Sequence, residues 1–368
     1  MIGIAEAFSP SYALARQKFL QACVGAGLRV DAQPHPLKGR DGEQLAMDVA
    51  LDGDADAQHI LIVTSACHGI EGHCGSGVQV FALNDAEWRD KARAAGVAVL
   101  YVHALNPHGF SHGRRVTHEN VDINRNFLDF SQPPPVNAHY AALHELLLPA
   151  DWPPSPDNEA ALGAWIGNNG AAAYQAAVTS GQYQFADGLF FGGNAPTWSN
   201  RTFRSVLRAY AAKAKHIAWI DLHTGLGPSG IGERIFACKD DAAAYARASS
   251  WWGGDGATPI TSIYDGSSNS AFLTGLMWNA VYQECPSSEL TAIAMEYGTM
   301  PLQDVLNALR GDHWLHQHPD AAPELAGAIH ARMKDAFYTD TDAWKGQIIS
   351  QARQAMFQAV DGLKSARD

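Results

Sequence analysis

Two histidines and a glutamate in this sequence have the spacing and the setting of metal ligands. His68 and Glu71 lie three residues apart in a glycine-containing turn, so an imidazole and a carboxylate can point at one ion. His223 closes an apolar run much later in the chain. Two imidazoles and a carboxylate, with a fourth position open, form the ligand set of hydrolytic zinc sites. A capped turn at residues 68–71 and a satisfied core histidine at position 223 are the plainer alternatives, and the conjunction favours the metal.

Residues 106–127 form a polar segment with three arginines. Arg114, Arg115 and Arg125 follow an apolar run, and a guanidinium fork suits capture of a carboxylate or stabilisation of an oxyanion. A solvated loop that starts with an Asn-Pro turn is the alternative explanation of this segment. The arginines therefore bear on chemistry only if the fold brings them beside the histidines.

Glu296 interrupts the apolar run of residues 292–297. A carboxylate in such a strand costs free energy unless it is paired or employed. We therefore predict that Glu296 is a general base, with a salt bridge as the alternative.

Apolar runs predict the strands that would position these side chains. Residues 59–66 and 97–102 are continuous, β-branched runs of the kind that parallel sheets bury on both faces, and a helix is expected between them at about residues 78–95. Residues 216–222 and 292–297 continue this pattern. Ligands bind beyond the carboxyl ends of strands in open α/β sheets, so we expect the two histidines to emerge at the same edge.

The flanking segments complete an α/β pattern. A helix is predicted at residues 11–26, strands at residues 28–33 and 45–51, and a further helix from Pro301. Strands that alternate with helices predict a three-layer α/β/α sandwich around a mostly parallel mixed sheet. We expect a single domain.

The predicted domain spans residues 1–368 and carries one elaboration. Proline clusters punctuate an alanine-rich stretch at about residues 130–200, which we interpret as an insertion, because core strands resume after it and no linker isolates it. The part of the chain from Leu302 onward is expected to be mainly helical.

The motifs in this order resemble the zinc metallocarboxypeptidase superfamily. The set comprises His-x-x-Glu, Asn-Pro-x-Gly-Phe at residues 106–110, Asp-x-Asn-Arg-Asn-Phe at residues 122–127, the strand-end histidine and the late glutamate. Succinylglutamate desuccinylase and aspartoacylase also belong to this superfamily. Residues 221–225 and 296–299 look more like these deacylases than like the digestive carboxypeptidases. Together with Gly-Gly at residues 192–193, they resemble a bacterial branch that spans nearly the whole chain.

The resemblance implies a role for each matching residue around one Zn²⁺ ion per chain. His68, Glu71 and His223 would be its ligands, and Glu296 would be the general base. Asp122 would accept a hydrogen bond from the other nitrogen of His68 and so fix its tautomer. Another divalent ion would also suit these ligands.

The resemblance also implies how a substrate would be held. Arg115 would stabilise the oxyanion, with Arg114 as the alternative, and Asn124 and Arg125 would bind a substrate carboxylate. The match is incomplete at one position. The tyrosine that caps the substrate in digestive members falls near Thr274.

Two tyrosines are candidates for the missing cap. Tyr264 and Tyr282 flank the region where it is expected. Neither can be assigned from the sequence, so the capping role stays open.

Composition excludes several classes of function. The chain has 26 Lys and Arg against 38 Asp and Glu, a net charge of -12, and no basic block, so we expect no nucleic-acid partner. No stretch reaches the roughly 18 apolar residues of a spanning helix, and no basic region precedes an apolar run near Met1, so we expect neither a membrane protein nor an exported one. Five scattered cysteines without a Cys-x-x-Cys pair fit a reducing, cytoplasmic setting.

A further histidine group lies near the predicted C-terminal helices. His313, His316 and His318 are close in sequence. We expect them to be solvated at a helix end and not to form a second metal site.

Two substrate classes fit the predicted site. A carboxypeptidase would cleave a peptide with a free C-terminus, and an amidase would remove an acyl group from an amino acid; Asn124 and Arg125 suit both. The insertion at residues 130–200 would narrow the cleft and favour a small peptide or acylated amino acid. A metal-containing binding protein without catalysis is the alternative of another class, and Glu296 and Arg115 argue against it. The oligomeric state is not predicted.

Overall fold

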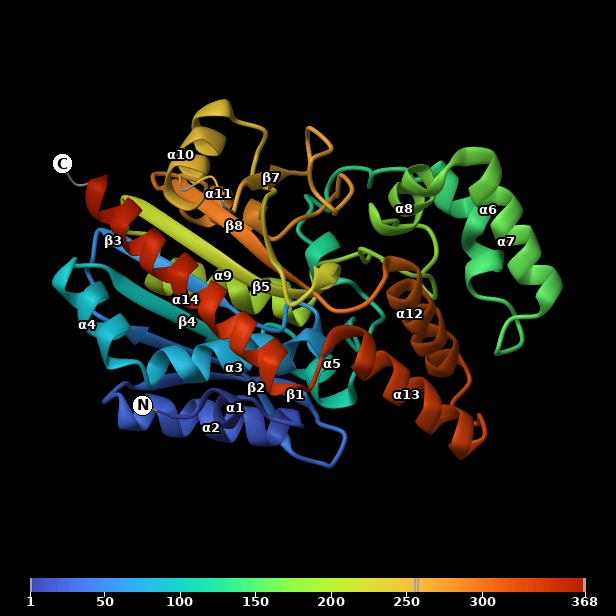
Figure 1. The fold of residues 1–368 in the computed structure, drawn as a ribbon, viewed down its shortest axis with the longest axis horizontal. Helices are drawn as coiled ribbons and strands as arrows, with labels where there is room; N and C mark the ends of the chain where they lie inside the picture. Colours follow the sequence, from blue (N-terminus) through green and yellow to red (C-terminus); the bar gives the residue numbers. More distant parts are fainter. Residues whose placement is uncertain (1, 255, 257, 367–368) are drawn as a thin grey trace.

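The core of the molecule is an eight-stranded mixed sheet (Figure 1). The computed structural model describes residues 2–254, 256 and 258–366. The strand order is β1-β2-β4-β3-β5-β8-β6-β7. Its strands are β1 (Val30–Lys38), β2 (Gln44–Asp52), β3 (His59–Thr64), β4 (Ala98–His103), β5 (His216–Ser229), β6 (Gly232–Phe236), β7 (Ile260–Ser262) and β8 (Glu289–Gly298). The four central strands β4, β3, β5 and β8 are parallel, and β6 is parallel to β7. The predicted mostly parallel mixed sheet is confirmed.

Helices cover both faces of this sheet. One layer holds α1 (Ile4–Ala7), α2 (Tyr12–Gly25), α3 (Gly72–Leu83), α4 (Ala86–Ala94), α10 (Ala242–Trp252) and α14 (Asp342–Ser365), and α14 contacts α1, α3, α4 and α10. Gly75 of α3 lies against Leu222 of β5. Successive strand residues face opposite sides, so Trp219 of β5 points to the other layer.

That second layer consists of α9 (Trp198–Tyr210) and α11 (Trp278–Glu284). The Trp219 ring lies 5.2 Å from Phe203 of α9 and 4.4 Å from Trp278 of α11, measured between ring centroids. The three-layer α/β/α prediction is therefore confirmed. His223 and Asp221 have the same parity as Trp219 along β5, so they share its face of the sheet.

A second apolar cluster lies at one end of the molecule (Figure 1). It joins α6 (Ala138–Leu147), α7 (Pro156–Asn169) and α8 (Ala171–Thr179) to α12 (Leu302–Gln317) and α13 (Pro323–Phe337). Tyr140 and Leu143 of α6, Leu162 of α7 and Leu309 of α12 are buried in it. The segment predicted as an insertion thus packs on the C-terminal helices. Its description as an insertion within one domain stays a prediction.

Some element boundaries differ from those expected. The helix predicted at residues 78–95 is two helices, because the Asp85 side chain accepts a hydrogen bond from the Trp88 amide and caps the start of α4. Strand β5 continues to Ser229, well past residue 222. Pro301 precedes the first helical residue of α12. The edge strand β1 starts at Val30 and accommodates Pro34 and Pro36, which an edge position allows.

Two composition-based expectations can be compared with the structure. Among the described helices, none has both the length and the hydropathy that a bilayer crossing requires. The five cysteines are buried free thiols.

Candidate metal centre and its cavity

The loop after β3 carries two of the predicted ligands in a tightly packed turn. His68 precedes the short 3₁₀ helix η1 (Gly69–Glu71), which leads directly into α3. The Gly69 amide donates to the Arg115 carbonyl at 2.9 Å, and the Ile70 amide donates to the Arg114 carbonyl at 2.9 Å. The turn is therefore bound through its backbone to the arginine segment.

Glycine is required where this turn meets α5 (Pro107–His112). A Cβ atom on Gly69 would lie 2.1 Å from the carbonyl carbon of Gly109. On the other side of the contact, the Gly109 amide donates to the Asn106 side chain at 2.9 Å, which fixes the start of α5. The Asn-Pro-x-Gly-Phe motif thus supports the ligand turn.

We expect Gly69→Ala to destabilise the protein by about 1–3 kcal/mol or more, because the clash is with backbone that cannot rotate away. Urea unfolding, followed by circular dichroism, measures this effect. Gly163→Ala is the matched control: a Cβ there meets nothing within 4 Å in α7, and it should raise stability by about 0.5–1 kcal/mol. Equal midpoints for the two variants would contradict the close approach.

The three predicted ligands converge on one point. His68 Nδ1 lies 3.2 Å from His223 Nδ1 and 2.9 Å from Glu71 Oε1, and His223 Nδ1 lies 3.0 Å from Glu71 Oε2. Ligands 2.0–2.1 Å from a tetrahedral ion are separated from one another by about 3.3 Å. The arrangement therefore fits a single zinc-sized ion bound by two Nδ1 atoms and a carboxylate. All three residues are buried.

The outer nitrogen of each histidine faces an aspartate. His68 Nε2 lies 3.2 Å from Asp122 Oδ1, the partner that the resemblance implies. His223 Nε2 lies 2.6 Å from Asp221 Oδ2, and Asp221 also accepts a hydrogen bond from Thr64 Oγ1. A carboxylate on Nε2 holds the proton there and leaves the Nδ1 lone pair directed inward. Two lone pairs and a carboxylate that face each other in a buried space call for a cation between them.

The sequence reasoning did not assign Asp221 a role. The signal for one was present, because an Asp-x-His pair on a strand places both side chains on the same face of the sheet.

The charges around the centre shift several pKa values. Burial alone would lower the His223 pKa, but the Asp221 and Glu71 carboxylates outweigh it and raise this pKa well above its usual value. Burial would raise the pKa of Glu71 and of Asp122, yet nearby histidines and, for Asp122, the Arg115 guanidinium hold both pKa values below their usual range. The two carboxylates are therefore anionic.

Glu296 lies beside the ligands on the neighbouring strand. It pairs in register with His223 across the parallel β5 and β8 strands, and its Oε1 accepts a hydrogen bond from the Leu226 amide at 3.0 Å. Burial and the Glu71 carboxylate raise the Glu296 pKa to about 8. No cation within salt-bridge distance of Glu296 is found among the described residues, so the alternative of a plain salt bridge is not favoured.

The structure places Arg115, and not Arg114, at the centre. Arg115 Nη1 donates to Glu71 Oε1 at 3.0 Å, and its Nε donates to Asp122 Oδ2 at 3.1 Å. Arg114 instead donates to Asp312 Oδ2 at 3.0 Å, and it does not reach the cavity lining. Only the first of the two predicted candidates is therefore positioned to contact a substrate.

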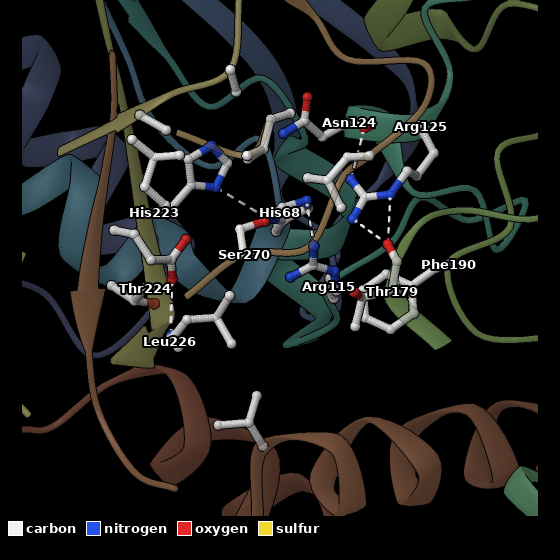
Figure 2. A pocket seen from close by; sticks show the side chains of 18 of the residues that line it. His68, Arg115, Asn124, Arg125, Thr179, Phe190, His223, Thr224, Leu226 and Ser270 are labelled. Atoms are coloured by element: carbon white, nitrogen blue, oxygen red, sulfur yellow. Dashed lines mark hydrogen bonds between the residues drawn. The ribbon is translucent and has the colours of Figure 1, made fainter. Parts of the chain in front are cut away.

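Asn124 and Arg125 line the same cavity on the side away from His223 (Figure 2). The Asn124 side-chain oxygen accepts from the Met277 amide at 3.1 Å, which turns its NH₂ group away from that contact. Arg125 donates to the Thr179 carbonyl from Nε at 3.1 Å and from Nη2 at 2.7 Å. The guanidinium is therefore oriented before any substrate arrives, and both terminal nitrogens retain a second N–H.

The segment at residues 130–200 contributes directly to this cavity. Phe190 packs its ring under two guanidinium groups, 5.0 Å from Arg115 and 5.6 Å from Arg125. Thr179 supplies the carbonyl that holds Arg125. Neither residue was identified from the sequence, because both lie in a stretch whose helices give no motif.

The rest of the cavity wall is mainly apolar. It is formed by side chains from β6, β8 and α11, from the loop after β7, and from α12 and α13, among them Ile235, Ile263, Leu273, Leu276, Trp278, Ala294, Leu302, Val305, Leu306 and Phe337. A substrate group bound there would lose little by leaving water if it were apolar.

No tyrosine is among the cavity-lining residues that the structure describes. The Tyr264 hydroxyl donates to the Cys238 carbonyl, and the Tyr282 hydroxyl accepts from the Lys239 amide at 3.2 Å. Neither candidate for the capping role faces the cavity. Ser270 and Leu273 occupy that side instead.

Two other groupings of candidate ligands are less suited to an ion. Cys67, Asp221 and His223 also lie close together, but this set would use the His223 nitrogen that Asp221 already engages. His313 was expected to be solvated, and this is wrong: it lies inside α12, is 1% exposed, and bonds to the Leu309 carbonyl.

Comparisons with known proteins give one family and several solved structures. The family model described as "Protein of unknown function (DUF2817)" matches residues 8–351. No match is found among curated proteins.

The solved structures that match share little sequence with this chain. The carboxypeptidase A from Helicoverpa armigera is 11% identical, with a TM-score of 0.48, over 89% of this chain and 73% of the other. Bovine thrombin-activatable fibrinolysis inhibitor is 12% identical, with a TM-score of 0.48, over 91% and 98%. The metallo-carboxypeptidase from Pseudomonas aeruginosa is 13% identical, with a TM-score of 0.45, over 95% and 69%.

Proposed function

The chain belongs to the DUF2817 family, and from the geometry of its own site we propose that it is a zinc-dependent hydrolase that cleaves an amide bond next to a free carboxylate. The observation that carries the proposal is the convergence of His68 Nδ1, His223 Nδ1 and the Glu71 carboxylate within 3.2 Å of one another. Glu296 and Arg115 beside this point argue against a metal-binding protein without catalysis.

A bound ion would polarise the scissile carbonyl and lower the pKa of a water molecule. Glu296 accepts the proton of the attacking water and passes it to the leaving amine. Its pKa of about 8, raised by burial and by Glu71, suits a group that must both take and release a proton near neutral pH. Arg115 donates to the oxyanion that develops on the carbonyl.

The tautomer of His68 links the ligand set to Arg115. His68 Nε2 lies between Asp122 Oδ1 at 3.2 Å and Arg115 Nη2 at 2.8 Å, and a neutral imidazole has one N–H. When Nδ1 is a ligand, Nε2 carries the proton and donates to Asp122, so it cannot accept from Arg115. The arginine is then available for a substrate.

Asn124 and Arg125 would hold the substrate carboxylate, and the apolar wall would receive its side chain. Arg125 is fixed by the Thr179 carbonyl and stacked on Phe190, so little of its side-chain entropy is lost on binding. The narrow, apolar cavity favours short peptides or acylated amino acids with an apolar side chain. Both a carboxypeptidase and an N-acyl-amino-acid deacylase meet this description.

A metal and substrate assay tests the proposal. The purified protein should contain one zinc ion per chain, and chelation should remove hydrolysis that added Zn²⁺ restores. A panel of N-acyl amino acids and short peptides, each with its C-terminal amide counterpart, should show turnover only with the free carboxylate. Hydrolysis that survives complete metal removal, or equal turnover of the amidated substrates, would refute the proposal.

Asp221→Asn should weaken metal binding by about 10- to 100-fold, because the amide can present its NH₂ group to His223 Nε2 and no longer fixes the proton there. Competition with a chromogenic chelator measures the affinity. Asp312→Asn is the control, because this buried aspartate pairs with Arg114 and does not touch a ligand. Equal zinc affinities for the two variants would contradict the role given to Asp221.

A further inference from the structure

A group of imidazoles lies apart from the candidate catalytic centre, around α5. We propose that His108, His112 and His118 form a second metal site, which takes a transition-metal dication of the Zn²⁺, Ni²⁺ or Cu²⁺ class. This inference does not depend on the proposed hydrolase activity.

The three rings are gathered by the local fold. His108 and His112 are four residues apart on α5, so they share one face of the helix. Their ring centroids are 4.1 Å apart, and the His118 ring lies 5.4 Å from that of His108. The candidate ligand pair at the catalytic centre, His68 and His223, has a centroid separation of 5.0 Å. The second group is therefore as closely spaced as the first.

Ring nitrogens in this group lack the partners that buried polar atoms normally have. His108 Nδ1 and His112 Nε2 are inaccessible to solvent and have no hydrogen-bond partner among the described residues. Such atoms cost free energy unless something satisfies them. His118 Nδ1 lies 3.2 Å from the Glu119 carboxylate, which favours the proton on Nδ1 and leaves the Nε2 lone pair for an ion.

The surroundings suit a metal better than a bound anion. His35 accepts the Leu37 amide on Nδ1 at 3.1 Å, so its other nitrogen carries the proton and the ring serves as a wall, stacked edge-on against Trp198. Burial and the adjacent imidazoles lower the His108 pKa to about 3, so this ring is neutral, as a ligand must be. The nearby guanidinium of Arg114 is neutralised by Asp312.

Imidazole ligands select the class of ion. Nitrogen donors favour Zn²⁺, Ni²⁺ and Cu²⁺ over Mg²⁺ and Ca²⁺, which prefer oxygen. The His108 and His112 rings are stacked with an interplanar angle of 17°, so a side-chain rotation is needed for both to reach one ion. His112 is partly exposed and has room for that rotation.

An ion at this position would fasten α5 to the loop that follows it. That loop contains Arg115, whose carbonyl accepts the Gly69 amide of the ligand turn. The second site would thus brace the segment that positions both the turn and the arginine, without itself contacting a substrate.

Nickel titration of a protein without an affinity tag tests this site in isolation. In the His223→Ala background, which removes a ligand of the catalytic centre, isothermal titration calorimetry should still show one Ni²⁺ bound per chain. Adding His112→Gln should abolish this binding at Ni²⁺ concentrations that saturate the His223→Ala protein. Adding His139→Ala instead, at an exposed histidine of α6, should leave it unchanged.

Folding is checked separately, so that a loss of binding can be interpreted. His112→Gln should keep the far-ultraviolet circular dichroism of the parent, and Ni²⁺ should raise the Tm of the His223→Ala protein but not that of the double variant. Absence of Ni²⁺ binding in the folded His223→Ala protein would overturn the proposal, as would unchanged binding after His112→Gln. Hydrolysis by the parent protein is unaffected by either of these outcomes, so the two proposals fail independently.

Discussion

Replacing Glu296 with glutamine is expected to lower kcat by about 10²- to 10⁴-fold while one metal ion per chain is retained. The amide is nearly the same size and its oxygen can still accept from the Leu226 amide, so the strand register and the ligands are not disturbed. What is lost is the ability to take a proton. Steady-state kinetics together with metal analysis of the same sample measures both quantities.

Glu233→Gln is the matched control for this substitution. Glu233 pairs with Glu296 in the register of β6 and β8, yet its carboxylate binds Asn269 and Thr261 and does not line the cavity. Its kcat should stay close to that of the parent. If the Glu296 variant turned over substrate at the parental rate with full metal content, another group would be the base.

Arg115→Met should reduce kcat by about 10²-fold, which corresponds to the roughly 3 kcal/mol that one oxyanion donor contributes. The methionine fills similar space but has no N–H for the developing charge. Because Arg115 also pairs with Glu71 and Asp122, rates are compared per metal-loaded chain, with the metal measured in the assayed sample. A change confined to KM would contradict a role at the oxyanion.

Arg114→Met provides the comparison with the neighbouring arginine. Its guanidinium pairs with buried Asp312, so its loss should lower the free energy of unfolding by about 3–5 kcal/mol through an unpaired buried charge. The kcat of the folded fraction should not change. The opposite pattern, a stable Arg114 variant with low kcat, would reverse the assignment of the two residues.

The sheet could be predicted from the sequence because its central strands are unambiguous. Residues 59–66 and 216–222 are apolar without interruption, and they became β3 and the first half of β5. The parallel pairing that follows from such runs places His68 and His223 at one edge. The second half of β5 could not be predicted, because Gly225 and Gly227 resemble a turn and only pairing with β8 keeps this stretch extended.

The candidate ligands could be predicted because each follows a strand or ends one. The residues that complete the cavity could not. Phe190 and Thr179 reach it through packing of α6–α8 on the C-terminal helices, which depends on tertiary contacts between distant segments. The same reason explains His313, whose burial is decided by what packs on α12 and not by its neighbours in sequence.

The reactive end of the cavity and its receiving end are built from different material. His223 and Glu296 stand on paired central strands, whereas Ser270, Leu273 and Leu276 come from the connection between β7 and α11. Exchanging that connection for variants of other size or polarity is a route to redirecting selectivity. A library confined to it would leave the hydrolytic apparatus untouched, so retargeted enzymes could be sought without rebuilding their chemistry.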